Sequence, residues 1–99
     1  MNNDKERSLL TKAYVWIENN QRAWDYMVCM ALKEVQAQRR VGMKWIIEET
    51  RKKDFATGDG TRFRINNTLS PCFARILMNQ YPDVKQYIET RPAGVDRVL

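Results

Sequence analysis

The chain has 99 residues and a formal net charge of +5, from 17 lysines and arginines against 12 aspartates and glutamates. This length predicts one domain, residues 1–99, and the composition is typical of a folded protein. The absence of histidine excludes catalysis by histidine pairs and most zinc sites. No apolar run is long enough to span a membrane and no secretion core follows Met1, so we expect a cytoplasmic protein of a bacterial host cell.

Three helices are predicted in the first half of the chain. Ser8 can cap the first, which continues to about Ile17, and residues 1–7 before it are expected to be a loose tail. Asn20 can cap the second, which runs to about Arg39 with one apolar stripe. Val41 and Gly42 interrupt the pattern, and a third helix is expected over residues 43–53. The apolar faces of these helices should bury Trp16, Trp24, Trp45 and the reduced thiol of Cys29.

The second half predicts a strand, a helix and a further extended piece. After a loop over residues 54–60, residues 61–65 alternate, with Phe63 and Ile65 inward and arginines outward. Ser70 and Pro71 are start signals for a helix over 70–80, with Cys72 on its apolar face. Asp83 can cap one more turn, and 87–91 looks extended. Residues 92–99 have few anchors and are expected to be loose, which leaves an ordered core of about 8–91.

A helix between two short strands, preceded by other helices, is typical of a winged helix-turn-helix protein. The predicted fold is therefore mainly α with a small β-sheet. Residues 39–64 contain eight lysines and arginines against four acidic residues, and clustered positive charge suggests a polyanion-binding surface. A solvated basic face without a ligand is an equally good interpretation of the charge alone.

One segment resembles a known family. The run Phe63-x-Ile65-Asn66-Asn67, followed by Ala74-Arg75, Pro82 and Glu89-x-Arg91, is similar to a family of small phage and prophage proteins. The likeness covers roughly residues 10–91, although Ile88 stands where that family usually has an aromatic residue and Arg64 where lysine is common. The resemblance implies a phage or mobile-element origin and leaves the activity unassigned.

The candidate DNA-binding residues fall into three groups. Arg75 and Asn79 lie on the helix that would enter the major groove, where an arginine can read guanine. For Arg75, a structural ion pair to Glu89 or Asp83 is a close alternative. The outward arginines of the extended pieces would contact phosphates, although outward charge also protects edge strands: Arg62, Arg64 and Arg91. The flanking phosphate contacts would be Arg39, Arg40, Lys44, Lys52 and Lys53.

The predicted function is non-enzymatic binding of duplex DNA, as a regulator or accessory factor. Pro82-Asp83 with Glu89 faintly resembles a nuclease pattern, but the two acids are close together and no lysine follows Glu89. We therefore predict no enzyme, metal site, cofactor or small-molecule substrate. The alternative is a protein-interaction module, homodimeric through the helix face Phe73–Leu77 or the tryptophan-bearing first helix, without nucleic-acid binding.

Overall fold

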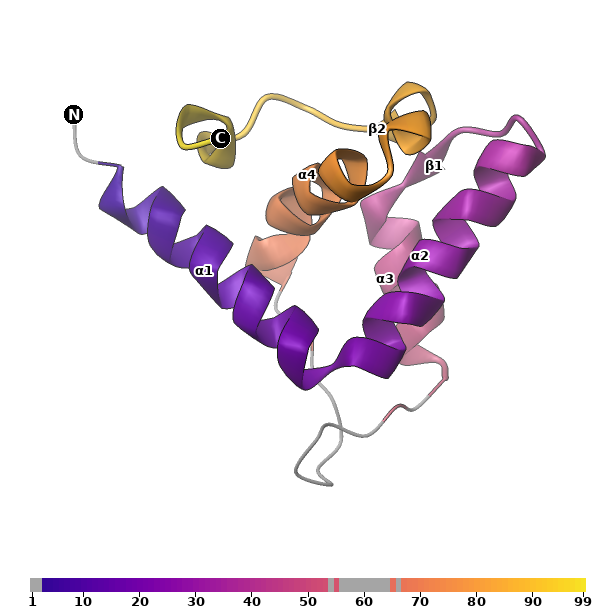
Figure 1. The fold of residues 1–99 in the computed structure, drawn as a ribbon, viewed down its shortest axis with the longest axis horizontal. Coiled ribbons are helices and arrows are strands. Elements are labelled where there is room, and N and C mark those ends of the chain that lie inside the picture. Colours follow the sequence, from indigo (N-terminus) through magenta and orange to yellow (C-terminus); the bar gives the residue numbers. More distant parts are fainter. Residues whose placement is uncertain (1–2, 54, 56–64, 66) are drawn as a thin grey trace.

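A computed structural model describes residues 3–53, 55, 65 and 67–99. This part of the chain is mainly helical, with one small parallel sheet (Figure 1). Its α-helices are α1 (Asp4–Asn19), α2 (Gln21–Gln36), α3 (Met43–Arg51) and α4 (Ser70–Gln80). The 3-10 turns are η1 (Asn67–Leu69), η2 (Pro82–Gln86) and η3 (Gly94–Arg97), and the strands are β1 (Val41–Gly42) and β2 (Ile88–Glu89). No helix within the described ranges is both long and apolar enough to cross a membrane.

The first helix begins earlier than the predicted cap. α1 starts at Asp4 rather than at Ser8, so the expectation of a loose segment is wrong for residues 4–7. Asp4 and Glu6 lie in the first turn, where carboxylates interact favourably with the positive end of the helix dipole. Asn20 separates α1 from α2, but its side chain does not cap α2. Its Nδ2 instead donates to the carbonyl of Trp16 at 2.9 Å and closes the end of α1.

The interruption at Val41 and Gly42 is a strand. α2 ends at Gln36, Gln38 adopts a left-handed backbone with φ 57°, and the chain then enters β1. β1 pairs in parallel with β2, with Val41 opposite Ile88 and Gly42 opposite Glu89. The extended piece expected near residues 87–91 thus exists as β2, and its partner is β1. The strand predicted over 61–65 cannot be compared, because residues 61–64 lie outside the described part of the chain.

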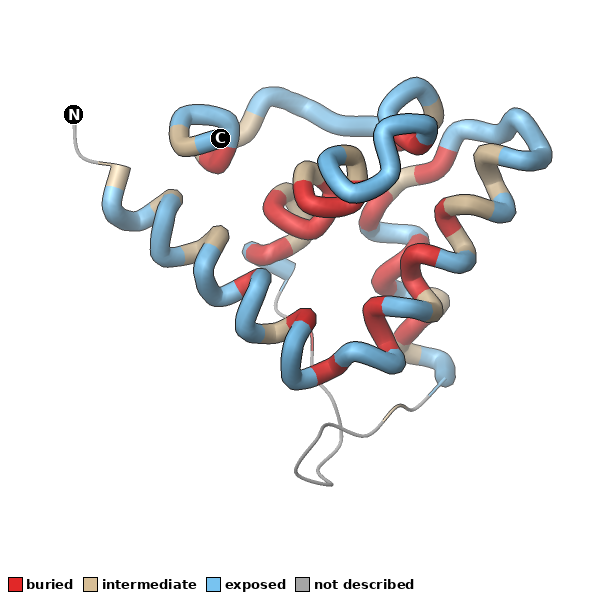
Figure 2. Tube along the Cα trace, viewed as in Figure 1, coloured by how far each residue is buried: buried red, intermediate tan, exposed pale blue. Residues whose placement is uncertain are grey.

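The core is built around α4. Phe73 and Leu77 are completely buried, and the rings of Trp16 and Trp24 lie 5.1 and 5.8 Å from that of Phe73. α1 and α3 both pack on α4, and η2 folds back against it. Buried residues therefore occur along most of α4 and on the inward sides of the surrounding helices (Figure 2). Trp45 differs from the expectation, since it lies on α3 with 46% of its surface exposed.

The carboxy-terminal residues are anchored to α1. η3 packs against α1, Val95 is only 2% exposed, and the Glu6 side chain fills the space where a Cβ on Gly94 would lie. The prediction of a loose segment over 92–99 is therefore wrong. A single buried valine and one close glycine contact do not produce the periodic pattern by which anchored segments are recognised in a sequence.

The two cysteines differ in their surroundings. Cys72 is buried on α4, as predicted, and burial together with the nearby Glu6 carboxylate raises the pKa of its thiol. Cys29 is exposed on α2, which corrects the expectation for this residue. Both are free thiols.

Candidate nucleic-acid interface

The helix expected to enter a DNA groove is the central helix of the fold. Five of its residues are buried, and only Asn79 and Gln80, at its carboxy-terminal end, are exposed. A recognition helix needs a solvent-facing side along its first turns, since those residues contact the bases. The packing of α4 therefore argues against this role, although Asn79 remains accessible.

Arg75 holds the carboxy-terminal segment onto α4. Its side chain is 9% exposed, and its Nε and Nη2 donate to the two carboxylate oxygens of Asp96 at 2.9 and 3.0 Å. Nη2 also donates to the Arg91 carbonyl at 2.6 Å. The structural alternative for Arg75 is thus the one that the geometry favours, but the partner is Asp96 rather than Glu89 or Asp83. These hydrogen bonds from Arg75, with one from the Ala93 amide, hold the pKa of Asp96 below its ordinary value.

Several of the predicted phosphate contacts are engaged within the protein. Arg39 pairs with Glu34 at 2.7 Å and Lys52 with Glu49 at 3.1 Å. The ammonium of Lys53 lies 5.5 Å from the centre of the Tyr26 ring. Surface pairs of this kind are weak and can open for a ligand, but they reduce the local positive field. Arg62 and Arg64 lie outside the described residues.

Arg51, which the sequence did not single out as a binding residue, has a structural role. It pairs with Glu48 and donates to the Ile65 carbonyl at 3.1 Å and to Asn67 Oδ1 at 2.8 Å. This arginine therefore connects the end of α3 to the residues just before α4. Its basic character gave no sign of this use, because both oxygens lie 14 or more positions away in the chain.

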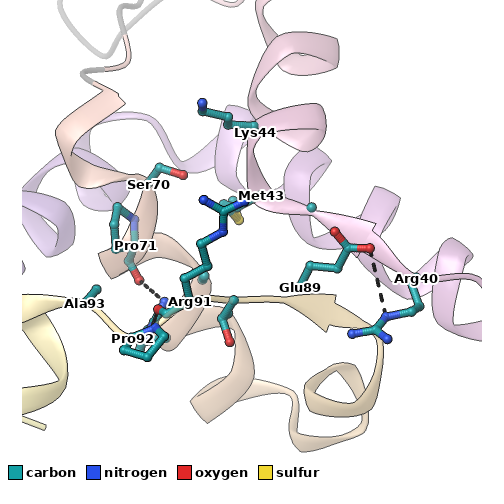
Figure 3. Close-up of a pocket in the computed structure, with 13 residues that line it drawn as sticks. Arg40, Met43, Lys44, Ser70, Pro71, Glu89, Arg91, Pro92 and Ala93 are labelled. Atoms are coloured by element: carbon teal, nitrogen blue, oxygen red, sulfur yellow. Dashed lines mark hydrogen bonds and ion pairs between the residues drawn. The ribbon is translucent and has the colours of Figure 1, made fainter.

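Three of the remaining candidates meet in one groove, which we call the basic groove, whereas Asn79 lines a different depression. It is an open depression of about 690 Å³ between β1 and the start of α3, the start of α4, and residues 89–93. Arg40, Lys44 and Arg91 line it, and all three are exposed (Figure 3). The Arg91 side chain extends between the first residues of α3 and α4, and Lys44 stands above it (Figure 3).

The field in the basic groove is positive. Among the described residues neither Lys44 nor Arg91 has a side-chain ion pair, and the one carboxylate in the lining, Glu89, lies 4.0 Å from Arg40. The first turns of α3 and α4 contain no acidic residue, and neither helix has a side-chain cap. N–H groups at helix starts carry partial positive charge, so the start of α3 adds to the field of the cations. The start of α4 adds less, because Pro71 has no N–H and η1 runs directly into Ser70.

The sequence identified the cations of this groove without predicting that they would meet. From the sequence, Arg40 and Lys44 were treated as flanking phosphate contacts, and Arg91 was placed on an extended piece of a predicted wing. Their convergence depends on the β1–β2 pairing, which places residues 40–44 beside 88–91. No group of three or more potential metal ligands occurs in the portion that the structure describes. Searches of protein-family models, curated proteins and solved structures found no match to this chain.

Proposed function

We propose that this protein binds the phosphate backbone of duplex DNA through the basic groove, without catalysing a reaction. The single observation behind the proposal is the convergence of Lys44 and Arg91, both without ion pairs in the described structure, at the starts of α3 and α4. Phosphate oxygens are recognised by such combinations of cations and helix amino termini. A winged helix-turn-helix geometry is not needed for this mode of binding.

The setting we propose is a regulator or accessory factor of a phage or prophage, acting in the bacterial cytoplasm. The support for this setting is the family resemblance of residues 10–91. The homodimer alternative through Phe73–Leu77 has little support, because Phe73 and Leu77 are fully buried inside one chain.

Binding should depend strongly on salt. Each phosphate contact releases condensed counterions, so the affinity for a fluorescently labelled duplex of about 20 base pairs should fall steeply between about 50 and 200 mM salt. Lys44→Ala and Arg91→Ala should each weaken binding and each reduce the slope of log K against log salt by about 1. Fluorescence anisotropy measures both quantities.

A matched control is available on α2. Lys33 is exposed and does not line the groove, so Lys33→Ala removes the same charge elsewhere. It should leave affinity and slope close to those of the unaltered protein. Absence of binding at about 50 mM salt, or equal losses for Lys33→Ala and Lys44→Ala, would contradict the proposal.

A further inference from the structure

A second groove lies on the other side of the segment that borders the basic groove. We call residues 90–92 the strap, since both depressions use them as a wall. The second depression, the apolar groove, has a volume of about 840 Å³ and runs between α1, the carboxy-terminal half of α4, η2 and the chain end. Its lining is more apolar than that of the basic groove, with Tyr14, Ile76, Met78 and Leu99 among its residues.

Two exposed hydrophobic side chains line this groove. Tyr14 and Leu99 belong to its wall, while 44% and 66% of their surfaces remain exposed. Val15, Trp45 and Tyr81, the other large exposed hydrophobic residues of the described structure, are not in its lining. Exposed apolar side chains in a groove mark an interaction surface more often than a solvated one.

One cation is available at the groove. Lys85 lines it and has no side-chain ion pair in the described ranges, whereas Arg91 borders it but extends its guanidinium into the basic groove. The one side-chain carboxylate in the lining, Asp96, is held by Arg75. A complementary ligand therefore needs apolar groups for Met78, Tyr14 and Leu99 and a carboxylate for Lys85. Met78 adds adaptability, since an unbranched thioether side chain adjusts to ligands of different shape.

We propose that the apolar groove binds an acidic amphipathic peptide segment of a partner protein. The open form of the groove suits an extended or helical segment, which buries a row of apolar side chains and leaves its acidic flank at Lys85. DNA is a poor occupant, because it offers phosphates and no apolar row. A second copy is also a poorer fit, because the exposed Trp45 of such a copy lies on a helix whose Glu48 and Glu49 already pair with Arg51 and Lys52.

The test is selection from a displayed library of random 12-residue peptides against the immobilised full chain. We expect enriched peptides that combine leucine, isoleucine or aromatic residues with aspartate or glutamate. The best synthetic peptide should bind in fluorescence anisotropy, and Tyr14→Asp and Lys85→Glu should each weaken it about tenfold or more. Both residues are exposed, so the variants should retain the urea unfolding midpoint of the unaltered chain.

The control is Lys33→Glu, which makes the same charge change as Lys85→Glu outside the groove. It should leave peptide affinity unchanged. Failure to enrich any peptide, enrichment of basic peptides, or equal effects of Lys33→Glu and Lys85→Glu would overturn the proposal. A dimer in sedimentation that Tyr14→Asp dissociates would also overturn it, in favour of self-association. Because these variants avoid the basic groove, a failure of DNA binding leaves this test unaffected.

Discussion

Arg75 shows how the role of one residue depends on contacts that are distant in the sequence. From the sequence it was a candidate for base contacts or for an ion pair with a nearby acid. In the structure it bonds Asp96, 21 positions away, and the carbonyl of Arg91, 16 positions away. Helical periodicity places Arg75 on α4 but says nothing about which later segment crosses it. Its partner could therefore not be predicted from local patterns.

Replacing Arg75 should destabilise the fold. Arg75→Ala removes three donors to Asp96 and the Arg91 carbonyl, and we expect a loss of about 2–3 kcal/mol in the free energy of unfolding. Arg75→Lys should recover little, because an ammonium cannot reproduce the two parallel bonds of a guanidinium. Urea unfolding followed by circular dichroism measures the loss. Two variants as stable as the unaltered chain would show that this ion pair contributes nothing.

The ion pair between Arg75 and Asp96 should make the free energy of unfolding depend on pH, because Asp96 can be protonated. The pKa of Asp96 is lowered in the folded state, so its contribution to stability is fully present above the ordinary aspartate pKa of about 3.9. That contribution is lost as the pH falls through the lower, folded-state pKa. Asp96→Asn should therefore be less stable than the unaltered chain at neutral pH, by about 1 kcal/mol at most, since solvent screens the half-exposed Asp96 carboxylate. The difference should shrink below about pH 4. Urea midpoints across this range test the expectation, and a difference that persists in acid would contradict it.

At the scale of elements, strongly patterned segments were predicted well. The helix expected over 70–80 is α4, Ser70–Gln80, because a start signal, an apolar face and a proline stop all agree. The helix expected over 43–53 is α3, Met43–Arg51. The parallel pairing of β1 with β2 was not predicted, because strands of two residues have no periodicity to recognise. The burial of α4 was also missed, since one apolar face in the sequence does not reveal packing by several neighbours.

The packing of η3 predicts that the carboxy-terminal turn contributes to stability. Val95→Ala removes two methyl groups from a site that is 2% exposed, and we expect a loss of about 1–3 kcal/mol. The exposed Lys33 on α2 provides a comparison, with a smaller effect expected for Lys33→Ala. Chemical denaturation quantifies both. An unchanged midpoint for Val95→Ala would restore the view of residues 92–99 as a loose segment.

At the scale of the whole molecule, the elements share one core. α4 contacts α1, α3 and η2, while η3 contacts α1, so no described helix has a separate apolar interior. We expect one cooperative unfolding transition, as is usual for a domain of this size. Tryptophan fluorescence and far-ultraviolet circular dichroism should give coincident urea curves, since Trp24 is buried at the centre while helical signal comes from all parts. Two separated transitions would show that part of the chain folds independently.

The sequence predicted several residues of the candidate site but not the groove in which they lie together. Net charge and the basic residues near α3 pointed to a polyanion, and four of the candidates, Arg75 among them, line one groove. Sequence alone could not separate the unpaired Lys44 and Arg91 from the paired Arg39, Arg40 and Lys52. Their pairing with Glu34, Glu89 and Glu49 depends on side-chain geometry. The apolar groove had no sequence signature, since its walls come from segments as far apart as Tyr14 and Leu99.

The strap has a consequence for any attempt to alter this protein. The strap separates the basic groove from the apolar groove, and the Arg75 guanidinium holds it in place by a hydrogen bond to the Arg91 carbonyl. A substitution in residues 90–92 that changes the shape of one groove also changes a wall of the other. The two grooves can therefore be altered independently only through lining residues outside the strap.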